Sequence, residues 1–180
     1  MSERKPKKIR KEVYCAHPIG DVWTALTDPH ALAEWLMPNN FEPVVGQKFR
    51  FQVDPVKGFD SGLRECEVLA VEPPRRLVYS WLAVPANPKK PYPKPITLTW
   101  TLTADSAGTH LVLELDGLEE LNWFYHLSLH YGWSRMLEKL LPKVLKNILG
   151  GRFTPGAIKR RGHGTKTVPD GYCQIKRFML

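Results

Sequence analysis

Alternating apolar and polar residues run through the middle of the chain and predict a series of β-strands. In residues 96–103, four apolar side chains alternate with four threonines, which is the period of a strand with one buried face. Similar alternation, or a high content of β-forming residues, marks five segments: 46–54, 63–72, 75–84, 96–103 and 109–117. Because short turns join most of these segments, we expect an antiparallel meander with one buried face.

Helical periodicity precedes and follows this meander. A first strand is expected at residues 8–15, and a short helix follows at residues 21–28 with Asp21 as its N-cap. Pro29 then opens a second short helix that ends before Pro38. A long helix is expected over the last part of the domain, at residues 119–149, where apolar residues recur at helical spacing. The proline inside it, Pro142, is expected to kink or split this helix.

The composition is that of an ordinary globular domain, with 43% hydrophobic and 24% charged residues. No run approaches the roughly 18 to 20 apolar residues of a transmembrane helix, and no apolar stretch of a secretory signal follows the basic N-terminus. The sequence has three cysteines, Cys15, Cys66 and Cys173. A small and odd number of cysteines is not typical of a disulfide framework. We therefore expect a cytoplasmic protein with reduced thiols.

The net charge of +8 is concentrated at the two ends of the chain. Residues 1–12 hold six basic and two acidic residues, and residues 151–180 hold seven basic and one acidic residue. We expect a basic extension, a globular domain and a Gly-containing basic extension, with these bounds: 1–8, 9–149 and 150–180. The extensions either keep the domain in solution or contact an anionic partner such as nucleic acid or a membrane surface. No nucleic-acid recognition motif supports contact with such an anionic partner.

Five phrases of sequence stand out in this order of elements. They are VWTALTDPHALAEWLMP at 22–38, GQKFRF at 46–51, CEVLAVEPPRRLVYSW at 66–81, AGTHLVLELDG at 107–117 and GWSRMLEKL at 132–140. Together with the order of elements, they resemble the START-like superfamily, also called SRPBCC. More narrowly, the chain is similar to the family named after an activator of the heat-shock-protein-90 ATPase. The resemblance covers residues 9–149. It implies an α+β helix-grip fold, in which a curved antiparallel sheet wraps around a long C-terminal helix and two short helices follow the first strand.

A helix-grip fold has a hollow between sheet and helix, and aromatic residues at inward positions are the candidate ligand contacts there. Two histidines at i, i+4 on the long helix join them, since neutral imidazoles hydrogen-bond ligands or transfer protons. The candidate set is Trp35, Phe51, Trp81, Tyr92, Trp100, Trp123, His126, His130 and Trp133. The last four fall at i, i+3, i+7 and i+10 and are expected to share one helix stripe. Alternatively, the tryptophans fill the core and the histidines have no chemical role.

Other features of the sequence limit the chemistry. A metal site at the two histidines would need a third ligand, and no H-E-x-x-H, P-loop or dinucleotide-binding motif is present, so no metal or cofactor is predicted. Residues 85–95 contain five prolines. This segment is either a polyproline II motif for a partner or a stiff connection that overhangs the cavity mouth, with Tyr92 on the rim.

These observations favour a cytosolic binding protein for a hydrophobic or aromatic small molecule. Two alternatives stay open. One is a polyketide cyclase or aromatase-like enzyme with His126 or His130 as proton shuttle. The other is a chaperone-accessory module, or a module that binds an anionic partner through the basic extensions. The sequence decides neither whether turnover occurs nor whether the chain forms a homodimer.

Overall fold

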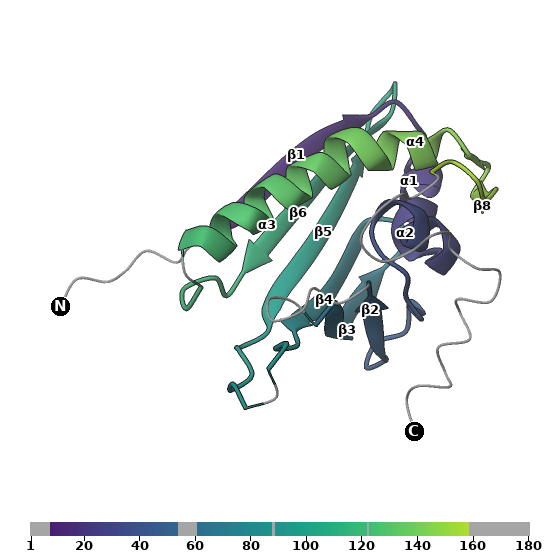
Figure 1. Cartoon of the computed structure of the whole chain (residues 1–180). Coiled ribbons are helices and arrows are strands. Elements are labelled where there is room, and N and C mark those ends of the chain that lie inside the picture. Colours follow the sequence, from purple (N-terminus) through teal and green to yellow (C-terminus); the bar gives the residue numbers. More distant parts are fainter. Residues whose placement is uncertain (1–7, 54–60, 88, 122, 159–180) are drawn as a thin grey trace.

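The main element of the computed structural model is a six-stranded curved sheet (Figure 1). The structure describes residues 8–53, 61–87, 89–121 and 123–158. All neighbouring strands pair antiparallel, in the order β1-β6-β5-β4-β3-β2. The strands are β1 (Ile9–Cys15), β2 (Lys48–Gln52), β3 (Leu63–Glu72), β4 (Arg76–Ala83), β5 (Ile96–Ala104) and β6 (Thr109–Asp116). The five-segment meander and the first strand predicted from the alternation are therefore all present.

Helices cover one face of this sheet (Figure 1). A continuous helix made of α3 (Trp123–Arg135), a π-helical segment η1 (Met136–Leu140) and α4 (Leu141–Leu145) runs across the face. Two short helices, α1 (Ile19–Thr27) and α2 (Pro29–Trp35), lie near the α4 end. Within the described ranges, no helix has the length and apolar character needed to cross a membrane. The arrangement confirms the predicted helix-grip α+β fold.

The buried face of each strand follows the predicted alternation. In β5 the four apolar residues from Ile96 to Leu102 are buried, whereas the intervening threonines lie on the opposite face and are more exposed. In β6 the three leucines between His110 and Asp116 are all buried. Side chains at every second position thus point toward the helix and form one continuous core with it.

The predicted N-cap at Asp21 was wrong. The helix α1 begins two residues earlier with Pro18 as its N-cap residue, whose fixed φ suits a helix start. Asp21 lies inside α1, where it is buried and its carboxylate accepts the backbone N–H of Gly151 at 2.7 Å. By contrast, Asp28 does cap α2, and its carboxylate accepts two backbone N–H groups of the first turn.

Pro142 changes the geometry of the long helix locally but does not end it. The residue has no backbone N–H, and the turn before it is π-helical, with the N–H of Leu141 donated to the carbonyl of Met136 five residues back. A π turn of this kind absorbs an irregularity while the helix continues. The helix is shorter at both ends than the predicted residues 119–149, since it begins at Trp123 and ends at Leu145.

A short hairpin follows the long helix and returns to the domain. It consists of β7 (Ile148–Leu149) and β8 (Arg152–Phe153). Beyond it, the buried carboxylate of Glu34 in α2 accepts the backbone N–H groups of Gly156 at 2.5 Å and Ile158 at 3.1 Å. Residues 150–158 therefore pack on α1 and α2. Most of the predicted basic extensions lie outside the described residues.

Candidate functional site

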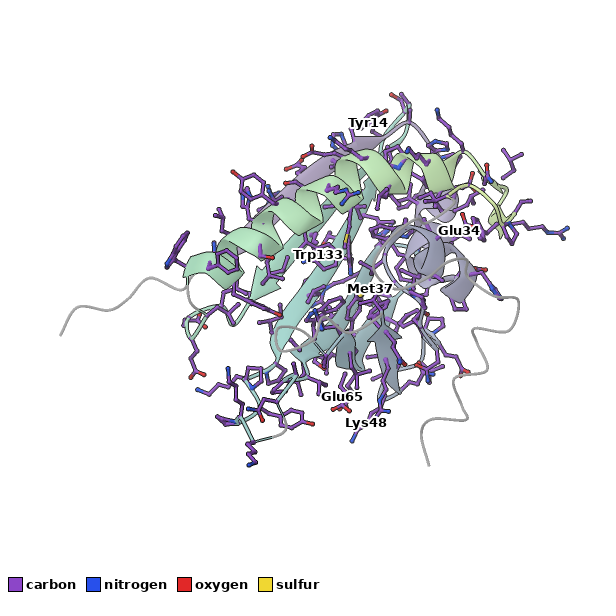
Figure 2. All side chains as sticks on the ribbon, viewed as in Figure 1. Tyr14, Glu34, Met37, Lys48, Glu65 and Trp133 are labelled. Atoms are coloured by element: carbon purple, nitrogen blue, oxygen red, sulfur yellow. The ribbon has the colours of Figure 1, made fainter. Side chains whose placement is uncertain are left out.

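Large aromatic rings fill the space between the helix and the middle of the sheet. The rings of Trp35, Trp100, Trp133 and Trp81 form a row, with successive centroids 6.1, 5.6 and 5.8 Å apart in edge-to-face geometry. Trp133 projects from the long helix toward the sheet (Figure 2). Phe51 continues the row beyond Trp81, at 5.2 Å. This packing fills the space near α2, and the described residues leave a cavity further along the helix.

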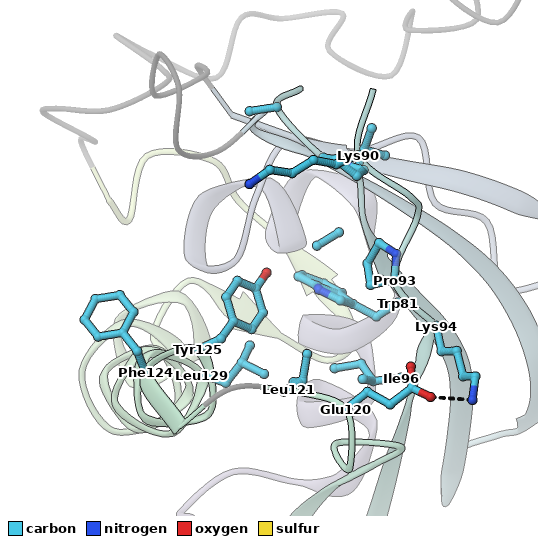
Figure 3. Close-up of a pocket in the computed structure, with 14 residues that line it drawn as sticks. Trp81, Lys90, Pro93, Lys94, Ile96, Glu120, Leu121, Phe124, Tyr125 and Leu129 are labelled. Carbon is cyan, nitrogen blue, oxygen red and sulfur yellow. Dashed lines mark hydrogen bonds and ion pairs between the residues drawn. The ribbon is translucent and has the colours of Figure 1, made fainter. Parts of the chain in front are cut away.

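The remaining space is a cavity beside the N-terminal half of α3 (Figure 3). Its larger lobe has a volume of about 420 Å³. Trp81 from β4 and Ile96 from β5 form part of its wall, and Tyr125 on α3 faces Trp81 across the space (Figure 3). The Pro-rich connection between β4 and β5 forms a further wall through residues such as Pro93 and Lys90. The cavity therefore lies where three separate parts of the chain meet.

A smaller lobe of about 180 Å³ extends along the same helix toward Trp133 and Met37. The two lobes share lining residues, so we treat them as one space and call it the groove. The shared residues are Trp81, Phe124, Tyr125 and Leu129. The groove thus runs from the Pro-rich connection to the edge of the aromatic core.

Charged side chains lie at both ends of the groove. At the larger lobe, Lys94 donates to the carboxylate of Glu120 at 2.5 Å, and this hydrogen bond raises the pKa of the lysine. Lys90 lines the same lobe. The smaller lobe contains Arg64, which is only 8% exposed and donates to the carbonyl of Leu63 at 3.0 Å. Among the described lining residues, basic groups outnumber acidic ones.

The structure brings only part of the predicted site together. Trp81 and Trp133 line the groove. Trp35, Phe51 and Trp100 are fully buried in the adjacent core and line neither lobe, because their neighbours already surround them. Two further candidates are exposed and lie outside the lining: Tyr92, at 59%, and Trp123, at 74%. A role for these five residues in ligand contact stays a prediction.

The two histidines lie on the flank of α3. A ring nitrogen of His130 is 3.0 Å from the ammonium of Lys11 on β1, and the same ammonium donates to Ser134 at 2.7 Å. His126 is half-buried and lines neither lobe. Of the four residues of the predicted stripe, Trp133 lines the groove, and Leu129 and Tyr125, spaced back from it by fours, line it as well. In the described part of the chain, no group of three or more His, Cys, Asp or Glu side chains is placed to hold a metal.

Sequence reasoning missed Arg64 and Tyr125, although both carried a signal. Arg64 stands two residues before Cys66 and four before Val68, so it occupies the inward face of β3. A basic side chain on the buried face of a strand is unusual, so it is a candidate functional residue. Tyr125 lies eight residues before Trp133, which is two helical steps of four along one face.

Comparison with known proteins agrees with this architecture. Protein MLL2253 from Mesorhizobium loti is 35% identical, with a TM-score of 0.65 over 75% of this chain and 94% of the other. CalU16 from Micromonospora echinospora is 26% identical, with a TM-score of 0.57 over 74% and 73%. DynU16, a protein in the dynemicin biosynthetic locus, shares the fold at 24% identity and a TM-score of 0.60, over 77% of this chain and 47% of the other.

The family model described as Activator of Hsp90 ATPase homolog 1-like protein matches residues 16–146. A search of curated proteins gave no match. The matched segment extends from the end of β1 to just past α4, so it includes both lobes of the groove. By its sequence and its helix-grip architecture, this chain belongs to the Activator of Hsp90 ATPase homolog 1-like family of START-like proteins.

Proposed function

We propose that this chain is a cytoplasmic protein that binds a hydrophobic or aromatic small molecule in the groove, without a cofactor. The binding unit is the helix-grip domain at residues 9–149. The observation that carries the proposal is the larger lobe, whose volume of about 420 Å³ is that of a small-molecule site. Aromatic and aliphatic side chains from the sheet, the Pro-rich connection and α3 form most of its wall.

The energetics of such a site follow from its lining. Removing apolar ligand surface from water contributes about 25 cal/mol per Å², so contact with Trp81, Ile96 and Leu129 supplies most of the affinity. Offset or edge-to-face contact with Trp81 and Tyr125 favours a ligand with rings. The Tyr125 hydroxyl and the Lys90 ammonium provide polar groups that orient the ligand within the larger lobe.

The other functions considered from the sequence have less support. A cyclase-like reaction would need a group placed to transfer protons, and neither His126 nor His130 lines the groove. Binding to an anionic partner would depend on basic extensions that lie mostly outside the described residues. Ligand binding, by contrast, is supported by the groove in the described domain.

A matched pair of substitutions on α3 tests the proposal. Leu129→Trp places an indole in both lobes, whereas Leu127→Trp, two residues earlier, adds the same group at a position that is 42% exposed and outside the lining. The probe is N-phenyl-1-naphthylamine, a neutral aromatic dye that fluoresces in apolar sites. We expect Leu129→Trp to weaken dye binding at least tenfold and Leu127→Trp to leave it unchanged.

Circular dichroism melting of both variants shows whether each one is folded. Equal dye binding by folded Leu129→Trp and wild-type protein would contradict the proposal. Native mass spectrometry of protein purified from its own host then identifies the natural ligand. A stoichiometric adduct should be present on wild-type protein and on Leu127→Trp, and absent from Leu129→Trp.

A further inference from the structure

Four large apolar side chains gather on the exposed side of α3. Trp123, Phe124, Leu127 and Tyr131 are exposed by 74%, 53%, 42% and 66%, and we call them the α3 patch. Three of them follow one another at intervals of four residues, so they form a stripe along the helix. Single exposed apolar residues are ordinary on a protein surface, whereas a contiguous group of them marks a contact with another surface.

Basic residues lie beside the α3 patch. β1 runs alongside α3, and the two elements begin at the same end of the molecule (Figure 1). The Lys11 ammonium on β1 donates to Ser134 on α3 at 2.7 Å. Lys8 is exposed at the start of β1, and the seven residues that precede it in the sequence include three basic and one acidic residue. On α3 itself, the exposed Arg135 follows Tyr131 after four residues and continues the stripe.

We propose that the α3 patch docks on an anionic lipid membrane. Tryptophan and tyrosine are enriched at the membrane–water interface, because one part of the ring is apolar and another meets water. A helix that lies in this interface places its apolar side chains among the lipids, while Lys and Arg attract anionic head groups. This inference does not depend on the proposed function of the groove.

The charge beside the patch distinguishes this partner from a second copy of the chain. The net charge of +8 opposes association of two copies, whereas it attracts the protein to an anionic surface. Lys8, Lys11 and Arg135 lie close to the patch, so the same approach brings both the apolar and the basic groups to the lipid. The apolar patch of the described domain carries the inference, and the basic residues determine the charge of the lipid.

A matched pair of double variants tests the inference. Leu127→Ser/Tyr131→Ser removes two side chains of the α3 patch. The control, Val44→Ser/Val45→Ser, removes two exposed apolar side chains from the loop before β2. The probe is vesicles of phosphatidylcholine with about 30% phosphatidylglycerol, and flotation measures binding. We expect the α3 variant to bind about tenfold more weakly than wild type, because binding scales with the apolar area that enters the interface. The loop variant should bind as wild type does.

Tryptophan fluorescence locates the face that meets the lipid. Trp123 is the one highly exposed tryptophan, since the other five are buried or half-buried. Vesicles with brominated acyl chains quench an indole that enters the lipid. We expect quenching in wild-type protein that is lost in Trp123→Phe. Vesicle binding by this variant should stay within about twofold of wild type, because phenylalanine keeps an apolar ring at the position.

Two controls separate docking from folding and from ligand binding. Circular dichroism melting shows whether each variant is folded. Binding of N-phenyl-1-naphthylamine in the absence of vesicles should be unchanged in Leu127→Ser/Tyr131→Ser, because both residues lie outside the lining of the groove. Raising the salt concentration should weaken vesicle binding, since attraction between exposed charges is screened.

Three outcomes would overturn the inference. The first is a failure of wild-type protein to bind the anionic vesicles. The second is equal vesicle binding by the two double variants, which would place the contact elsewhere on the chain. The third is a wild-type dimer in analytical ultracentrifugation that becomes a monomer in Leu127→Ser/Tyr131→Ser, which would assign the patch to a second copy. By contrast, the expected vesicle results without dye binding by wild type would support this inference while contradicting the proposed function.

Discussion

At the scale of single residues, Trp81 connects the core with the groove. Its ring contacts Phe51 and Trp133 in the aromatic row, and it also lines both lobes. A substitution there would change stability and binding together, since removing a buried indole costs about 3 to 5 kcal/mol. Leu129 lines the same lobes from α3, is half-buried and is not part of the row of rings. It is therefore the better position at which to separate binding from folding.

The two described cysteines offer a test of burial at the residue scale. Burial raises the pKa of the Cys15 thiol to about 11 from its ordinary value of 9.0, and it also raises the pKa of the Cys66 thiol. Because the thiolate is the reactive form, a native Cys173→Ser variant should incorporate almost no iodoacetamide at about pH 8. After unfolding in guanidinium chloride, intact mass should show two modified thiols. Rapid modification of the native variant would contradict the buried placement.

The same pKa shift predicts a pH dependence of stability. The folded-state pKa of Cys15 lies above its unfolded value, so the folded state is favoured by this thiol at pH below about 9. That contribution is lost as the pH rises toward about 11, because the unfolded chain then releases the proton more readily. Urea unfolding between these pH values should show a fall in the free energy of unfolding that is smaller in Cys15→Ala.

At the scale of elements, the two short helices hold the chain that follows the long helix. Asp21 and Thr24 in α1 contact Gly151, and Glu34 in α2 receives two backbone N–H groups from beyond β8. These contacts join segments more than a hundred residues apart. They cover the end of the core where α4 packs against α1 and α2.

Glu34→Ala should therefore destabilise the protein by about 2 kcal/mol, because the backbone N–H groups of Gly156 and Ile158 lose their charge-assisted hydrogen bonds to this buried carboxylate. The measurement is the midpoint of urea unfolding. Glu42→Ala is the matched control, since Glu42 is an exposed carboxylate on the loop before β2, and its removal should change stability by less than about 0.5 kcal/mol. Equal midpoints for the two variants would show that the contacts of Glu34 do not stabilise the fold.

The elements also show which features of the fold could be predicted from the sequence. β5 was predictable because strict alternation has a single interpretation when one face is buried. Asp21 was misassigned because a short acidic side chain near a helix start serves equally as an N-cap or as an acceptor for a distant N–H. Local sequence cannot distinguish these, since Gly151 lies 130 positions away. The π turn before Pro142 likewise depends on how the helix packs.

The candidate site was predictable only in part for the same reason. The sequence pattern identified Trp100 on the inward face of its strand and Trp133 on the apolar stripe of the helix. It could not distinguish a ring that lines a cavity from one that fills the core. That difference depends on how α2 and the long helix pack around each ring. Arg64 carried a readable signal, an inward basic residue, which the emphasis on aromatic residues left unused.

At the scale of the whole molecule, the two ends of the long helix differ in how firmly they are packed. In α4, Leu141, Val144 and Leu145 are buried, whereas in α3 Trp133 is the one buried residue. The first turns of α3 instead carry exposed apolar side chains, namely Trp123, Phe124 and Leu127. The groove lies beneath this less buried half. On the proposed function, ligand entry would therefore require movement where the helix is packed least firmly.

Hydrogen–deuterium exchange tests this division. In the free protein, amides at 125–131 should exchange at least tenfold faster than those at 139–145, because opening the first turns exposes little buried surface. N-phenyl-1-naphthylamine at ten times its Kd should slow exchange at 125–131 about tenfold, since the dye binds only where the groove is formed. The Leu129→Trp variant, with the groove filled, should show no such change. Slowing at 139–145 alone would place the bound dye at the other end of the helix.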